Sequence, residues 1–128
     1  TYGGNAVAAA TAMAVLEEMK AQDLQENARV IGAYARERMH KLAEKHSIIG
    51  DVRGVGMVFG AELVLDQQTQ TPATVEADRV INAMREKGVL LSKLGCHRNT
   101  LKIRPPLPFS VENADMLFDT LDEVLAAL

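Results

Sequence analysis

The spacing of apolar residues predicts a first helix directly after a glycine-rich turn. Residues 6–16 are apolar except for Thr11, and Asn5 is a suitable N-cap, so we expect a helix over residues 6–20. Eleven residues are too few to cross a bilayer, which needs about 20. Because a helix that is apolar on all sides must be covered, we expect the covering residues to lie outside this chain, which would then be a fragment of a longer protein.

A second helix is predicted to begin at Asp23, which forms a capping-box-like pair with Glu26. Apolar residues recur at helical spacing along one face and are expected to be buried: Leu24, Ala28, Ile31, Ala35, Met39 and Leu42. The charged residues of the opposite side are expected to face water: Arg36, Glu37, Arg38 and Lys41.

Two further helices are predicted in the second half of the chain. Thr74 is the expected N-cap of the third, and Gly88 ends it. Ser110 is the expected N-cap of the fourth, whose apolar face runs from Ala114 to the C-terminal Leu128.

Period-2 alternation predicts the strands. Alternate residues from Met57 to Leu65 are apolar, which indicates a pair of short strands joined near the glycines of residues 51–56. Residues 89–91 and 100–104 are two more expected strands, and the latter stops at Pro105 because proline cannot donate to a sheet ladder. The order of elements predicts an α+β fold, in which three or four mainly antiparallel strands are covered by helices on one face.

Composition narrows the function classes. The chain has 128 residues, 48% of them apolar, and a net charge of −3, which suits one globular domain and argues against nucleic-acid or membrane partners. Cys96 is the single cysteine, so a multi-cysteine metal site is excluded and a cytoplasmic location is expected. The histidines are expected to be ordinary surface residues: His40, His46 and His97.

Two features could bind an anion. Gly3 and Gly4 precede a helix start, where backbone N–H groups favour negative charge, although a plain turn into a helix is the simpler explanation. Lys102 and Arg104 share one face of a strand and could grip a carboxylate or phosphate. The alternative is a charged edge strand that discourages unwanted pairing, and local sequence does not decide between the two.

Three motifs together resemble the C-terminal part of class III aminotransferases, which are pyridoxal-phosphate enzymes of fold type I. They are residues 1–5 (TYGGN) before the Ala-rich helix, residues 51–56 (DVRGVG) and residues 102–107 (KIRPPL). The resemblance covers the whole chain and implies the C-terminal small domain, with the helix that leads into it, of such an enzyme. The wording of the last motif is most similar to alanine–glyoxylate-aminotransferase-like enzymes and amino-alcohol phosphate phospho-lyases.

The resemblance implies roles for particular residues. The family forms homodimers, and Thr1 would donate a hydrogen bond to the phosphate of pyridoxal 5'-phosphate held mainly by the other subunit. By resemblance, Lys102 occupies the position of a substrate-binding cation that is usually Arg. Lysine lacks the planar guanidinium that binds a carboxylate through two hydrogen bonds, and Arg104 on the same face could supply it. The Schiff-base lysine lies upstream of residue 1 in the family, so this chain alone is expected to be inactive, with no catalytic residue of its own.

The expected function is transfer of an amino group between an amine or amino acid and a keto acid or aldehyde, in partnership with an upstream large domain. The first alternative is elimination of phosphate from a phosphorylated amino alcohol by the same fold. The second is a non-catalytic α+β interaction module, which should cover its own apolar helix, whereas a fragment should leave that helix exposed.

Overall fold

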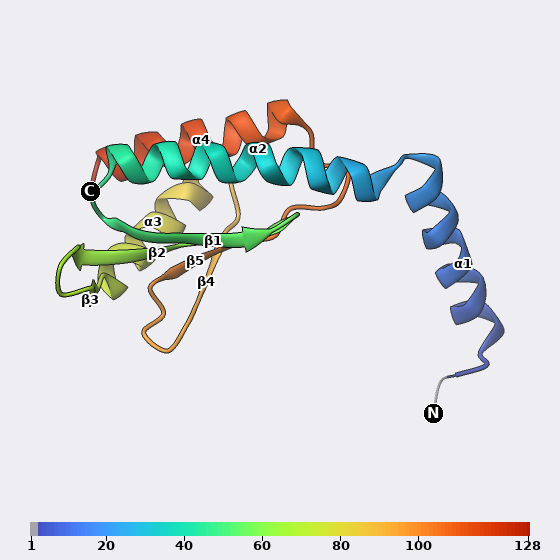
Figure 1. Cartoon of the computed structure of the whole chain (residues 1–128). Coiled ribbons are helices and arrows are strands. Elements are labelled where there is room, and N and C mark those ends of the chain that lie inside the picture. Colours follow the sequence, from blue (N-terminus) through green and yellow to red (C-terminus); the bar gives the residue numbers. More distant parts are fainter. Residues whose placement is uncertain (1–2) are drawn as a thin grey trace.

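The computed structural model describes residues 3–128, which form an α+β fold (Figure 1). The four helices are α1 (Ala6–Ala21), α2 (Leu24–Lys45), α3 (Thr74–Glu86) and α4 (Val111–Ala126). The five strands are β1 (Ile49–Val55), β2 (Val58–Asp66), β3 (Thr71–Pro72), β4 (Ser92–Leu94) and β5 (Thr100–Ile103).

The sheet is antiparallel, in the order β1-β2-β5-β4, and the two-residue strand β3 pairs with β2. The predicted α+β architecture is confirmed, with one short strand more than expected. In the register of the sheet, Ala61 of β2 lies opposite Leu101 of β5, and Gly60 lies opposite Lys102.

One face of the sheet carries the core. Phe59 and Leu101 point from the strands into a cluster that also contains buried residues of α2, α3 and α4. The Phe59 ring stacks on that of Phe118 in α4, with ring centroids 6.2 Å apart. The three helices therefore cover this face, and the opposite face of the strands carries the alternate residues, among them Lys102.

The apolar helix α1 stands apart from this body. It projects from the start of α2 (Figure 1), contacts α2 alone among the elements of the described chain, and has no buried residue. Four of its large apolar side chains are at least half exposed: Val7, Met13, Val15 and Leu16. Within residues 3–128, then, α2 alone contacts this helix, and most of its apolar surface is left uncovered.

Of the four predicted N-caps, Asn5 and Ser110 are confirmed, Asp23 stands at the expected position without the expected cap bond, and Thr74 is wrong. Asp23 has a left-handed backbone (φ 49°) and makes no side-chain cap bond, while Glu26 binds Arg29 instead. Thr74 lies inside α3, and its hydroxyl donates to the His97 carbonyl at 2.6 Å. Ser110, in contrast, caps α4 in a complete capping box.

The strand expected at residues 89–91 is also wrong, because the pairing begins at Ser92. The Val89 amide donates to the Met84 carbonyl at 2.9 Å and so closes the end of α3. Val89 is only 9% exposed, which explains its apolar character by burial against the core without a strand.

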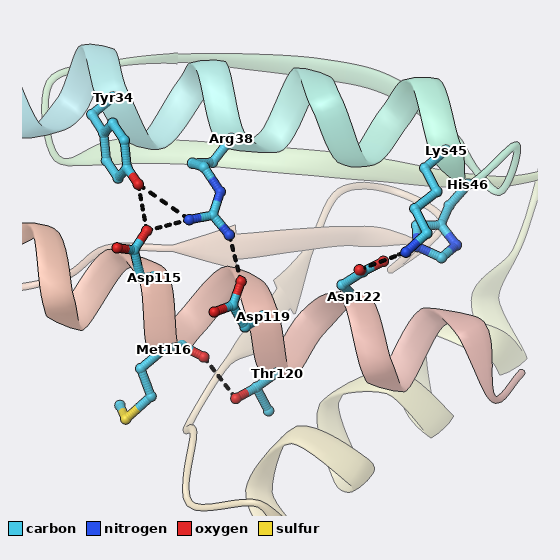
Figure 2. A network of polar contacts seen from close by, with 9 residues as sticks. All are labelled: Tyr34, Arg38, Lys45, His46, Asp115, Met116, Asp119, Thr120 and Asp122. Carbon is cyan, nitrogen blue, oxygen red and sulfur yellow. Dashed lines mark hydrogen bonds and ion pairs between the residues drawn. The ribbon is translucent and has the colours of Figure 1, made fainter.

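Only some of the α2 side chains expected to face water do so. Glu37 and Lys41 do so and pair at 2.6 Å. Arg38 instead lies between α2 and α4, where its guanidinium pairs with Asp115 and Asp119, and Tyr34 joins the same network (Figure 2).

A second contact joins the far ends of α2 and α4. The Asp122 carboxylate binds Lys45 at 2.6 Å and His46 at 2.5 Å (Figure 2). The His46 side chain is only 10% exposed, so its expected surface position is wrong.

Candidate functional site

Lys102 and Arg104 stand on the face of the sheet that the helices leave open. Their neighbours Leu101 and Ile103 are buried in the core, so alternation turns Lys102 the other way. Lys102 is half-buried between Gly60 of β2 and Ser92 of β4, and Arg104 is exposed where the chain leaves β5.

The two cations stand between two hollows of the surface. One, of about 530 Å³, is lined by Leu90, Leu91 and Ser92 together with the pair. The other, of about 370 Å³, is lined by the β1–β2 hairpin together with residues of β4 and β5, and Lys102 and Arg104 are the residues that both hollows share. A ligand in either hollow would therefore meet both charges.

The neighbouring cation Arg53 is already neutralised. Its guanidinium binds Glu62 at 2.5 Å and also Asp51, and these hydrogen bonds, Glu62 first, raise the pKa of Arg53 above its ordinary value. Lys102 and Arg104 have no ion-pair partner anywhere in residues 3–128. Both charges are therefore available to an anionic ligand.

Gly60 sets the local geometry beside Lys102. A Cβ at this position would overlap the Leu101 carbonyl oxygen, so β2 and β5 approach each other more closely here than any other residue allows. The sequence does carry a signal for this, because an isolated glycine inside a strand often marks a close approach of two backbones.

Thr1, the expected contact to a cofactor phosphate, lies outside the described residues. Of the same motif, Gly4 has φ +87° and Asn5 caps α1 by accepting from the Ala8 amide at 3.0 Å. This leaves backbone N–H groups at the start of α1 without an intrahelical acceptor, and the space around Gly3 and Gly4 is open. The chemistry of this turn fits the phosphate of a cofactor.

The helix start and the cation pair are not brought together within this chain. The beginning of α1 lies at the end of the molecule away from the sheet (Figure 1). If both parts serve active sites, they must do so with help from other polypeptide.

The remaining lysines of the body are used in structure. Their partners are carboxylates: Lys41 binds Glu37, Lys45 binds Asp122, Lys87 binds Glu123, and Lys93 binds Asp78. Among the described residues, no group of histidine, cysteine and acidic side chains has the geometry to hold a metal ion. No helix in the same range combines the length and apolar character that a membrane crossing requires.

Comparison with known proteins agrees with the motifs. Residues 1–125 match the family model described as aminotransferase class-III. A curated relative, "Alanine--glyoxylate aminotransferase 2 homolog 2, mitochondrial" of Arabidopsis thaliana, is 45% identical over 122 residues, which are 95% of this chain and 26% of that protein.

Solved structures extend the same picture. A phospholyase from Arthrobacter in complex with phosphoethanolamine is 40% identical, with a TM-score of 0.87 over 91% of this chain and 28% of that one. A PLP-bound amine transaminase from an uncultivated Pseudomonas species is 33% identical, with a TM-score of 0.90 over 99% of this chain and 29% of that one. The chain therefore spans less than a third of each of these proteins.

Proposed function

This chain belongs to the class III aminotransferase family, and on that premise we propose that it is the C-terminal small domain, with the helix leading into it, of a longer enzyme. The observation that carries the proposal is the match of residues 1–125 to the family model, with the same fold in a PLP-bound transaminase. The exposed apolar surface of α1 supports it, since a self-sufficient module would cover that helix.

The proposed activity of the whole enzyme is transfer of an amino group between an amine or amino acid and a keto acid or aldehyde. The cofactor of this family is pyridoxal 5'-phosphate, which acts as an electron sink when bound. The present chain would contribute binding and orientation, because the lysine that carries the cofactor in the family precedes the motif at residues 1–5.

Lys102 and Arg104 are the proposed substrate-binding residues. Their availability, their shared face and their place between two hollows support binding of an anionic substrate group. Since Lys102 presents a point charge, the planar guanidinium of Arg104 would supply any bidentate contact to a carboxylate.

The proposed assembly is a homodimer that includes an upstream large domain from each chain. Thr1 would donate to the cofactor phosphate across the dimer interface, beside the open N-terminus of α1. This assembly accounts for the separation of the helix start from the cation pair, because each would then serve an active site completed by other polypeptide.

Phospho-lyase chemistry is the second candidate. A phospholyase with phosphoethanolamine bound is 40% identical to this chain, and two adjacent cations suit a dianionic phosphate. The same fold would then eliminate phosphate from a phosphorylated amino alcohol.

Two assays of the full-length enzyme separate these candidates. One supplies an amino acid with pyruvate and measures amino-group exchange; the other supplies phosphoethanolamine and measures release of phosphate and ammonia. Exchange without phosphate release supports the aminotransferase, and efficient phosphate release supports the phospho-lyase.

A cytoplasmic location is the proposal for the whole enzyme, resting on the single, exposed Cys96. The Arabidopsis relative carries "mitochondrial" in its name. Fractionation of cells that produce the full-length protein distinguishes the two compartments.

A further inference from the structure

Asn27 makes an unusual pair of long-range hydrogen bonds from α2. Its side-chain amide nitrogen donates to the Leu107 carbonyl at 2.6 Å and to the Phe109 carbonyl at 3.1 Å. These acceptors lie 80 and 82 residues further along the chain, and the contacts are partly buried. One amide group thus fixes two points of the segment that joins β5 to α4.

This segment, residues 105–109, makes few other hydrogen bonds, although Phe109 packs against the core. Pro105 and Pro106 have no backbone N–H and cannot extend the β5 ladder. The Phe109 amide donates to the Pro106 carbonyl at 3.1 Å, which closes a local turn. Within residues 3–128, the Asn27 bonds are the side-chain hydrogen bonds that the segment receives.

Arg104 immediately precedes this segment and lies beyond the last residue of β5. Its backbone is therefore fixed by β5 on one side and by residues 105–109 on the other. Arg104 lines both hollows that it shares with Lys102, so a shift of this segment would move its guanidinium relative to either one.

The same helix also holds the opposite wall of the site. Arg36 donates to the Gly54 carbonyl at 2.8 Å, and Gly54 lines the 370 Å³ hollow with Lys102 and Arg104. Helix α2 is thus bonded to both segments that flank the cation pair, although it lies on the other face of the sheet.

We propose that Asn27 is a positioning residue for Arg104, holding residues 105–109 so that the guanidinium stays beside Lys102. The inference rests on the proposed anion-binding role of that pair. Asn27 touches no ligand itself and acts through the backbone that follows Arg104.

The test uses the full-length enzyme and Asn27→Asp, which keeps the size of the side chain but sets carboxylate oxygens against two carbonyl oxygens. KM is measured for an amino acid and for an amine of similar size that lacks the carboxylate. We expect KM for the amino acid to rise about tenfold, the scale of a small misplacement, with less than about a twofold change for the amine. The matched control is Asn82→Asp, at an exposed position of α3, which should change neither value.

A double-mutant cycle with Arg104→Met separates positioning from general destabilisation. If Asn27 acts through Arg104, Asn27→Asp adds little to the KM of the Arg104→Met enzyme. Full additivity, or equal changes for amino acid and amine, would overturn the inference and leave the proposed function standing. An unchanged KM in Arg104→Met would overturn both the anion role of Arg104 and the inference.

Hydrogen exchange gives a readout that does not depend on activity. In the full-length protein, Asn27→Asp should speed amide exchange in the peptide covering residues 101–110 and leave the α3 peptide unchanged. If Asn27→Asp does not fold, Asn27→Ala removes the donor without the repulsion and is expected to give the same pattern. Unchanged exchange at residues 101–110 in a folded variant would contradict the proposal.

Discussion

Gly32 of α2 lies against the backbone of Gly56, in the turn between β1 and β2. A Cβ at position 32 would lie 2.6 Å from the Gly56 carbonyl carbon, and Gly56 itself has φ +53°. Because both partners are backbone, neither can rotate away. This contact, with the Arg36 bond to Gly54, fixes the hairpin relative to α2.

Gly32→Ala should therefore destabilise the protein, even though alanine is the better helix former. We expect a loss of about 1–3 kcal/mol in the free energy of unfolding, the usual cost of overpacking. Urea denaturation measures it. Ala33→Gly, at the exposed neighbouring position, reports the helix-propensity effect alone, at about 1 kcal/mol. A Gly32→Ala protein more stable than the parent would show that the contact relaxes.

Arg38 provides a test of the α2–α4 interface. Its guanidinium carbon lies 5.8 Å from the Phe118 ring centroid and 5.9 Å from that of Tyr34, and its nitrogens bind two α4 carboxylates. We expect Arg38→Met to cost about 1–2 kcal/mol of stability. Arg38→Lys should lose less stability than Arg38→Met but should not match the parent, because lysine keeps the positive charge without the planar guanidinium.

The control for Arg38 lies one turn away on the same helix. Both side chains of the Lys41–Glu37 pair are exposed, so Lys41→Met should have a much smaller effect on the urea midpoint. Equal effects of the two substitutions would mean that the Arg38 network adds nothing to stability beyond an ordinary surface pair.

Asp122 should make stability depend on pH in the acid range. Hydrogen bonds from Lys45 and then His46 hold the pKa of Asp122 below its ordinary value. A carboxyl whose pKa is lowered by folding stabilises the protein above its unfolded pKa of about 4, and this contribution is lost as pH falls through the folded pKa. Urea midpoints measured between about pH 6 and pH 2 should therefore fall less steeply for Asp122→Asn. An unchanged slope would show that Asp122 is not a source of the acid sensitivity.

Because the apolar helix α1 is exposed, we expect the isolated 128-residue chain to associate with itself. Val7 is 76% exposed and Met13 is 56% exposed, an apolar surface of the kind that drives association. The isolated chain should self-associate and bind an apolar dye, and removing residues 1–21 should reduce both. Light scattering and dye fluorescence measure this, and a monomeric, dye-silent chain would contradict it.

Local sequence predicted those elements whose determinants are local. The expected helix over residues 6–20 and the hairpin of β1 and β2 match the structure closely, and Ser110 caps α4 as expected. In each case the hydrophobic spacing or the capping residue that determines the element lies within a few adjacent residues.

The errors share a different cause, which is contact with distant segments. Threonine is a residue type favoured at the N-cap of a helix, yet the Thr74 hydroxyl donates to the carbonyl of His97 instead. Arg38 occupies a polar position of α2, but α4 supplies carboxylates that draw it inward. The helical spacing of apolar residues in α2 does not show which side chains of another helix will pair with its polar residues.

The candidate site likewise has one part that the local sequence predicts and another that depends on distant contacts. The alternation of residues along β5 is enough to predict that Lys102 and Arg104 lie on one face. Neither the hollows beside them nor the Asn27 contacts could be found in the sequence. Each hollow is formed by residues from different segments, and Asn27 meets carbonyl groups 80 and 82 residues further along the chain.

The most direct test of the central claim is the absorbance of bound pyridoxal phosphate, titrated into the full-length protein and into the isolated 128-residue chain at equal concentrations. The account predicts a saturable cofactor band in the full-length protein and none in the isolated chain. A saturable band in the isolated chain, or its absence from the full-length protein, would contradict the assignment of this chain to the small domain of a two-part enzyme.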